Sequence, residues 1–194
     1  MDVAVFIALL RGINVAGKNI VKMIELKQTF EELGLVNVRT YLQSGNVVFS
    51  GPAQSETDMA KIIEAALQKK LGLTVPVIVR TSDRMKVVVE GNPFLSEGIG
   101  KTGKALRSDN ESKFYVTFLS DEASDLGLQK LKCITSIPDR YAAVGEEVYL
   151  HCPDGYGRSK FSNNVIERAL KTGATTRNWK TVKQLVAISQ ECHF

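Results

Sequence analysis

The sequence predicts an α+β protein made of two ferredoxin-like halves with mainly antiparallel sheets. Apolar segments of strand length alternate with segments whose apolar residues recur at helical spacing. Tight turns that contain glycine join neighbouring strands, as in β-hairpins. The order of the elements begins again after a polar stretch near the middle of the chain. In the first half this order is βαββαβ, which is the ferredoxin-like pattern.

The first half opens with a strand, a loop and a helix. Residues 3–10 are apolar without a helical stripe, so we expect a buried strand, followed by a glycine-containing loop over residues 11–21. The helix that follows ends near Gly34. Its apolar residues recur at helical spacing: Met23, Leu26, Phe30 and Leu33.

A hairpin, a helix and a strand complete the first half. Residues 38–43 and 47–50 flank Ser44-Gly45-Asn46, whose glycine and asparagine suit a tight turn. A helix begins near Ser55, presents one apolar face and ends at Gly72. Residues 75–80 alternate and are β-branched, which favours a strand.

The middle of the chain is a connection. Ser82 and Asp83 can begin a helix, whereas the valines at 87–89 favour a strand, and we expect a helix over residues 81–90. Residues 91–112 are rich in Gly, Ser, Asn and Lys, which predicts a mobile link. The predicted parts are therefore residues 1–81, 82–112 and 113–194.

The second half repeats the order as βαββα with a final helix. We expect a strand over residues 114–119, a helix capped by Ser120, and a helix over residues 161–170. A hairpin around Gly145-Glu146 joins residues 140–144 to 148–152, and the last helix covers residues 179–189. No residue-level similarity between the halves is evident, so the predicted repeat is one of element order only.

Composition indicates a soluble cytoplasmic protein without a membrane partner. The 194 residues are 44% hydrophobic and 24% charged, which suffices for a core. The longest apolar run, residues 3–10, is far shorter than the roughly 20 residues of a membrane-spanning helix. The three cysteines lack C-x-x-C spacing, so we expect free thiols. The two histidines are placed in a way that argues against a metal site.

Positive charge is concentrated near both ends of the chain. The net charge is only +4. Residues 3–23 contain three basic side chains and no acid, and residues 154–190 contain seven basic against two acidic ones. An anionic partner should therefore meet the first loop and the last quarter of the chain.

The first loop is a candidate anion site. Arg11 and Lys18 are its cations, and Asn14 and Asn19 supply side-chain amides beside two glycines. Backbone N–H groups between a strand and a helix favour phosphate. The alternative is that these residues only serve turn geometry. From the hairpin turn we add Ser44 and Asn46 to the candidate ligand-binding residues.

A second candidate lies where a predicted strand ends and a helix begins. Arg158 and Lys160 flank Ser159, which is a candidate helix N-cap. Cations at a helix N-terminus are unfavourable unless an anion lies nearby, which favours a binding site. The alternative is that both side chains simply extend into solvent.

The third candidate segment contains the only tryptophan. An exposed Trp179 could stack on a base while Arg177 binds a phosphate and Asn178 assists. The alternative is that Trp179 anchors a terminal helix in the core, with Asn178 or Thr176 as the cap.

His151 and Cys152 resemble a nucleophilic pair but are adjacent on a predicted strand. Their side chains therefore point to opposite faces, and we expect Cys152 to be a small core residue.

Four strings of the sequence resemble a bacterial family called domain of unknown function 1697. They are RGINVAGKN from Arg11, TYLQSGNVVF from Thr40, DGYGRSK from Asp154 and TTRNW from Thr175. The first departs at Ala16, where the family usually has glycine. The resemblance implies an α+β fold of two ferredoxin-like pieces and supplies no established activity.

The combined observations favour a binding protein for an anionic ligand in a basic cleft between the halves. The ligand would be a nucleotide, a phosphorylated metabolite or a nucleic-acid backbone. One alternative is an enzyme acting on a phosphorylated small molecule, with Tyr156, Asp154 or His151 moving protons. The other is an interaction module without a small ligand. We expect these cations to converge on one face: Arg11, Lys18, Arg158, Lys160 and Arg177.

Overall fold

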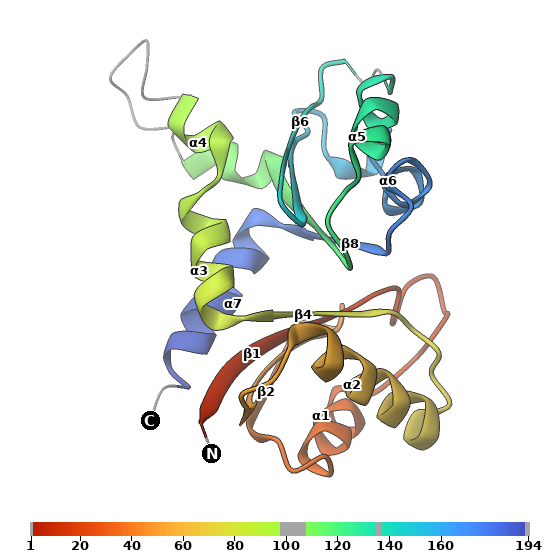
Figure 1. The fold of residues 1–194 in the computed structure, drawn as a ribbon, viewed down its shortest axis with the longest axis vertical. Helices are drawn as coiled ribbons and strands as arrows, with labels where there is room; N and C mark the ends of the chain where they lie inside the picture. The colour runs from red at the N-terminus through yellow and green to blue at the C-terminus, as the bar shows by residue number, and fades with distance from the viewer. Residues whose placement is uncertain (1, 98–107, 135–136, 193–194) are drawn as a thin grey trace. The chain divides into compact units, whose positions relative to one another are not determined.

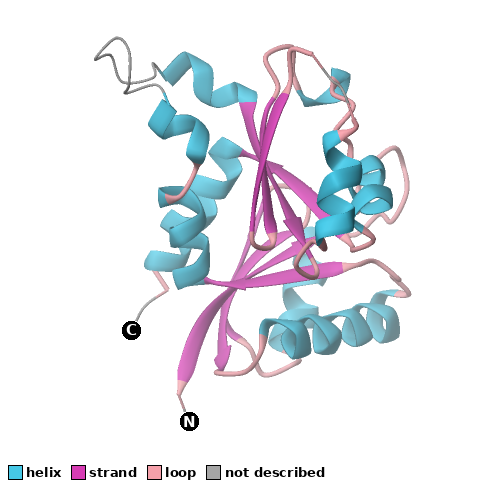
Figure 2. Ribbon diagram, turned by 45° about the horizontal axis from the view of Figure 1, so that its top comes forward, coloured by secondary structure: helices cyan, strands magenta, loops and turns pink. Residues whose placement is uncertain are grey.

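A computed structural model describes residues 2–97, 108–134 and 137–192 of the chain (Figure 1). It contains two four-stranded sheets in which every strand pair is antiparallel, together with helices (Figure 2). The predicted α+β class with antiparallel sheets is confirmed. Part of the predicted mobile link lies outside the described residues, and within them its ends form helix α4 (Pro93–Glu97) and a 3₁₀ turn (Ser108–Lys113).

The chain divides into two compact units. The N-terminal unit comprises Met1–Lys86 with Gln184–Phe194, and the C-terminal unit comprises Val87–Lys183. In the N-terminal unit the end of the chain is held by a hydrogen bond between the hydroxyls of Ser82 and Ser189 (2.7 Å) and by one that Arg39 donates to Glu191 (2.6 Å). The boundaries expected from the sequence remain a prediction about which segments fold independently.

The N-terminal unit has the strand order β2-β3-β1-β4, with β1 and β3 in the middle. Helices α1 and α2 pack on one face of this sheet (Figure 1). Helix α3 follows directly from β4 and confirms the helix expected over residues 81–90. The elements are β1 (Val3–Leu10), α1 (Met23–Glu31), β2 (Val36–Tyr41), β3 (Asn46–Pro52), α2 (Glu56–Leu71), β4 (Val77–Thr81) and α3 (Ser82–Glu90).

The core of the N-terminal unit forms between its sheet and helices. Phe49 of β3 lies 5.6 Å from Phe6 of β1 and 5.3 Å from Phe30 of α1, measured between ring centroids. On the opposite face of β1, Ile7 and Leu9 are also buried. Burial on both faces explains why this strand is a continuous apolar run instead of an alternating one.

The C-terminal unit has the corresponding strand order, β6-β7-β5-β8. Helices α5 and α6 pack against one face of its sheet (Figure 2). Cys152, Phe161 and Leu150 belong to the core between them. The elements are β5 (Phe114–Leu119), α5 (Asp125–Lys132), β6 (Arg140–Val144), β7 (Glu147–His151), α6 (Asn163–Leu170), β8 (Ala174–Asn178) and α7 (Trp179–Gln190).

Strand β8 corrects the sequence analysis, which treated its residues only as the approach to the last helix. The segment pairs with β5, placing Arg177 opposite Val116 and Thr175 opposite Phe118. Two consecutive threonines favour a strand, but the surrounding polar and charged residues conceal the signal. The second half therefore completes the order βαββαβ.

Two predicted helix starts are also corrected. The cap of α5 is Ser124 instead of Ser120, and its hydroxyl accepts a hydrogen bond from the Gly127 N–H at 3.2 Å. Helix α6 begins after Ser162, so Ser159 is not its N-cap. Serines near a helix start are common enough that spacing alone does not select the one that caps.

The final strands of the two units repeat the same side-chain contacts, which extends the predicted repeat beyond element order. In both units a glutamate of the preceding helix accepts a hydrogen bond from the backbone N–H of the first strand residue. The Val77 N–H donates to Glu64 at 2.8 Å, and the Ala174 N–H donates to Glu167 at 3.0 Å. An arginine donates to the carbonyl just before it in both strands, Arg80 at 2.9 Å and Arg177 at 3.0 Å. The next residue then caps the following helix: Thr81 for α3 and Asn178 for α7.

Candidate functional site

The loop after β1 folds into a tight turn at its tip. The Lys18 N–H donates to the Val15 carbonyl at 2.9 Å, and the two residues between them have positive φ, 49° at Ala16 and 73° at Gly17. All four residues of the turn are exposed. The loop therefore presents Lys18 at its tip.

The asparagines of this loop are used to hold its shape. Asn14 accepts a hydrogen bond from the Val21 N–H at 2.9 Å and donates to the carbonyls of Val21 and Gln43. Asn19 donates to the Gly12 carbonyl at 3.0 Å. These contacts support the turn-geometry interpretation for both side chains.

The hairpin turn between β2 and β3 packs against the same loop. Asn46 is fully buried, and its amide donates to the Tyr41 carbonyl (2.8 Å) and the Ser44 hydroxyl (3.1 Å). A Cβ on Gly45 would lie 2.8 Å from an Ile13 side-chain carbon, so only glycine fits there. Of the candidates in the N-terminal unit, Arg11 is half-buried and Lys18 is exposed.

In the C-terminal unit, three strand ends meet at one end of the sheet. The first residues of β5 pair with the last residues of β7 and β8, with Phe114 opposite His151 and Tyr115 opposite Asn178. Tyr156, from the segment after β7, packs against Tyr115 with 5.2 Å between ring centroids and a tilt of 32° between the rings. The segment that carries Arg158, Ser159 and Lys160 is thus brought to the end of the sheet where α7 begins.

A hollow of about 420 Å³ opens at this end of the sheet. Lys183 forms a 2.5 Å ion pair with Glu111, whereas Lys180 is exposed and has no ion pair with any residue that the structure describes. Both lysines lie in or next to the first turn of α7, which contains no acidic residue. The lining consists of Glu111, Ser112, Tyr115, Asn178, Lys180 and Lys183.

Two candidates from the same segment are buried. Trp179 is 1% exposed, which excludes stacking of an exposed ring on a base and supports the core-anchor interpretation. Its indole Nε1 has no hydrogen-bond partner among the described residues. Arg177 donates to the Thr175 hydroxyl (2.8 Å) and the Thr176 carbonyl, and burial lowers its pKa to about 10. At neutral pH its guanidinium remains charged.

The remaining candidates fall into structural and exposed groups. Asn178 accepts the Thr181 N–H at 2.8 Å as the cap of α7, while Ser159 accepts the Phe161 N–H at 3.0 Å. Arg158 and Lys160 are exposed. Sequence reasoning missed Tyr115, Lys180 and Lys183. The three-residue spacing of the two lysines already places them on one side of the last helix.

Cys152 is packed as expected for a core residue, and His151 is half-buried. The ring of His151 lies 4.9 Å from that of Phe114, and Cys152 is fully buried. Burial raises the pKa of the Cys152 thiol to about 11, so it remains protonated at neutral pH. A protonated, buried thiol is not a nucleophile.

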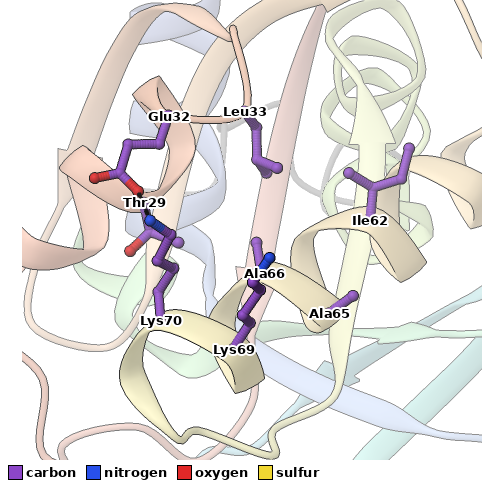
Figure 3. Close-up of a pocket in the computed structure, with 8 residues that line it drawn as sticks. All are labelled: Thr29, Glu32, Leu33, Ile62, Ala65, Ala66, Lys69 and Lys70. Atoms are coloured by element: carbon purple, nitrogen blue, oxygen red, sulfur yellow. Dashed lines mark ion pairs between the residues drawn. The ribbon is translucent and has the colours of Figure 1, made fainter.

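A second hollow, of about 410 Å³, lies between α1 and α2 of the N-terminal unit (Figure 3). Leu33 and Ile62 flank it, and Ala65 and Ala66 make its floor shallow. Lys70 forms a 2.7 Å ion pair with Glu32 at its rim. Lysines in the last turn of a helix are favoured by the helix dipole, which accounts for the charge here without a ligand.

Within residues 2–97, 108–134 and 137–192, no group of three or more His, Cys, Asp or Glu side chains is arranged to hold a metal ion. Over the same residues, every helix is too short or too polar to span a bilayer.

Comparison with known proteins identifies the family. A sequence model of the family described as "Protein of unknown function (DUF1697)" matches residues 3–149 of this chain. The matched range includes two of the four strings that carried the resemblance, those beginning at Arg11 and Thr40. The chain is also similar to a solved structure described as conserved bacterial protein SP0830 from Streptococcus pneumoniae. The TM-score is 0.72 at 20% identity, over 97% of this chain and 99% of that one, a likeness of fold. No curated protein matches the chain. The chain belongs to the DUF1697 family.

Proposed function

We propose that this protein binds a phosphorylated ligand that carries an aromatic ring, such as a nucleotide, in the hollow at the start of α7. The observation that carries the proposal is the combination of Lys180, Lys183 and the ring of Tyr115 around one space of about 420 Å³. Small-molecule sites are typically hollows of about 300–1,000 Å³ with a few polar groups.

The electrostatics of α7 support an anionic ligand. A helix N-terminus carries partial positive charge, and a cation placed there costs about 0.3–1 kcal/mol. Lys180 occupies this unfavourable end without an ion pair to any described residue, Lys183 is paired there with Glu111, and Arg177 adds a third cation just before the cap. A phosphate would interact favourably with the lysines and with the helix dipole together.

The tyrosine pair supports an aromatic component. The ring of Tyr156 packs against that of Tyr115 at a tilt of 32°, and the Tyr156 hydroxyl donates to Thr176 at 3.1 Å, which fixes the Tyr156 ring. Thr176 in turn bonds Asn163 at 2.6 Å. Tyr115 is therefore a supported, half-exposed ring, and stacking of a base on such a ring contributes about 1–3 kcal/mol.

The proposal includes the ferredoxin-like topology of each unit and a larger basic site. The strand orders β2-β3-β1-β4 and β6-β7-β5-β8 support the topology, because a split βαβ arrangement places the first strand between the third and the fourth. Arg11, Lys18, Arg158 and Lys160 are proposed to contact the same polyanion when the ligand is extended, as in a nucleic-acid backbone.

The test compares Lys180→Ala with Lys130→Ala, which removes an exposed lysine of α5 in the same unit. Thermal shift and calorimetry with mononucleotides, sugar phosphates and inorganic phosphate should show binding to the wild type. Losing one charged hydrogen bond costs about 1.5–3 kcal/mol, so Lys180→Ala should weaken binding by about tenfold or more, and Lys130→Ala should not. Tyr115→Leu should weaken nucleotides but not inorganic phosphate. Equal binding by both lysine variants would contradict the site.

A further inference from the structure

The four sheet edges differ in how their outward backbone groups are bonded. An edge strand presents unpaired N–H and C=O groups that another strand can use. In β4 these groups are bonded by side chains of Glu64, Glu56 and Arg80. In β8 they are bonded by Glu167 and Arg177. On both edges a further strand would have to displace these side chains to pair.

The third edge, β2, is irregular. Its register shifts between Val36 and Arg39, and Asn37 has a φ of 54°. The Arg39 side chain pairs with Glu191 of the chain end at 2.6 Å. A bulge and a charged side chain are both devices that stop edge pairing.

The fourth edge, β6, is regular, and no strand other than β7 among the described residues pairs with it. Its pairing with β7 is continuous from Arg140 opposite His151 to Val144 opposite Glu147, across a two-residue turn. In such a hairpin the residue before the turn, Val144, exchanges backbone hydrogen bonds with its partner strand. Because inward and outward positions alternate along a strand, Tyr141 and Ala143 direct their backbone N–H and C=O groups outward, away from β7. No side chain among the described residues bonds these groups, in contrast to β4 and β8.

We propose that β6 pairs antiparallel with β6 of a second copy of this chain. A two-fold axis at Ala142 would set Tyr141 opposite Ala143 of the other copy, and all outward N–H and C=O groups of these residues would then be bonded. The same register sets Arg140 opposite Val144, so no like charges meet. Val144 is 54% exposed, and the small side chains of Ala142 and Ala143 allow the second β6 strand to approach closely.

A second copy fits this edge better than a foreign peptide. Peptides that add to a sheet edge gain specificity from side-chain pockets beside it. Neither hollow described above is lined by a residue of β6. Self-pairing needs no such pocket, because the proposed register provides hydrogen-bond partners for the outward backbone groups of both strands. Such a short strand pair buries little area, so the dimer should be weak and concentration-dependent.

The first test blocks the edge without disturbing the sheet. Sedimentation velocity over increasing concentration should show the wild type shifting from monomer to dimer. Ala143→Pro removes an outward N–H that the sheet does not use, and should raise the dimer dissociation constant at least tenfold while circular dichroism stays native. A wild type that stays monomeric throughout, or an Ala143→Pro variant that dimerises equally well, would overturn the proposal.

The second test checks the register and does not depend on proline being tolerated. Val144→Lys places a cation opposite Arg140 of the other copy and should weaken the dimer, whereas Val144→Asp should strengthen it. Val36→Lys, at an exposed valine of the β2 edge, is the matched control and should leave dimerisation unchanged. Equal effects of Val144→Lys and Val144→Asp would refute this register and with it the pairing proposed here.

Discussion

Ala16 adopts a backbone conformation that favours glycine. Its φ is 49°, in the left-handed region, where a Cβ costs roughly 1–2 kcal/mol. The side chain is exposed, so no packing offsets this strain.

Ala16→Gly should therefore stabilise the protein. After the greater chain entropy of glycine is subtracted, we expect the free energy of unfolding to rise by about 0.5 kcal/mol. Urea denaturation followed by circular dichroism measures it. Ala65→Gly, at an exposed site inside α2, should instead lower it by about 1 kcal/mol. If both glycines destabilise the protein, Ala16 is not strained.

Glu56 connects three neighbouring secondary-structure elements of the N-terminal unit. It is the first residue of α2, and its carboxylate accepts hydrogen bonds from the Thr81 N–H (2.7 Å) and from Arg84 (2.9 Å). It also lies 3.7 Å from the guanidinium of Arg80, whose side chain is 3% exposed. One carboxylate thus ties together the start of α2, the end of β4 and the start of α3.

Removing this carboxylate should be costly. Glu56→Ala removes an ion pair from the buried Arg80 guanidinium and the acceptor of the Thr81 N–H, so we expect a loss of about 2 kcal/mol in unfolding free energy. Lys61→Ala, which breaks an exposed pair with Asp58 on the same helix, should change it by less than about 0.5 kcal/mol. Chemical denaturation measures the unfolding free energy of both variants. If the two variants lose similar amounts, Glu56 acts only as a surface charge.

The regular elements differ in how readily the sequence reveals them. Gly72 is left-handed at the end of α2, with a φ of 66°, as its position after the last apolar residue predicts. Gly45 and Gly145 lie in the two hairpin turns expected from their dipeptides. Strand β8 was missed because its polar residues are satisfied by tertiary contacts, including Thr117 with Thr176 at 2.7 Å. Local sequence patterns predict backbone geometry, whereas hydrogen bonds between side chains of distant strands form only when the chain has folded.

At the scale of the whole molecule, the charge distribution leads to a prediction about polyanions. Lys18 belongs to the N-terminal unit and Arg158 to the C-terminal unit, and both are exposed. If one polyanion contacts both, each alanine substitution should reduce the slope of log affinity against log salt by about 0.7 for single-stranded nucleic acid. Neither substitution should change stability by more than about 0.5 kcal/mol.

Fluorescence titration of a labelled single-stranded oligonucleotide at several salt concentrations tests this expectation. The double variant Lys18→Ala/Arg158→Ala should lose about twice the slope of each single one, and Lys130→Ala should retain the wild-type slope. A slope that depends on only one of the two residues would place the polyanion on one unit alone. That result would not contradict the nucleotide site proposed at α7, because the hollow lies within the C-terminal unit.

By itself the sequence determined the α+β class, the hairpins, most of the helices and the family, because these depend on local periodicity, turn residues and short strings. Only the tertiary structure decided which candidates were exposed. Trp179 and Asn46 proved to be buried, and the amides of Asn14 and Asn19 hold their own loop. The same structure brought Tyr115, from a strand far away in sequence, beside Lys180. Burial and long-range strand pairing depend on what the rest of the chain packs against, and no local pattern encodes that.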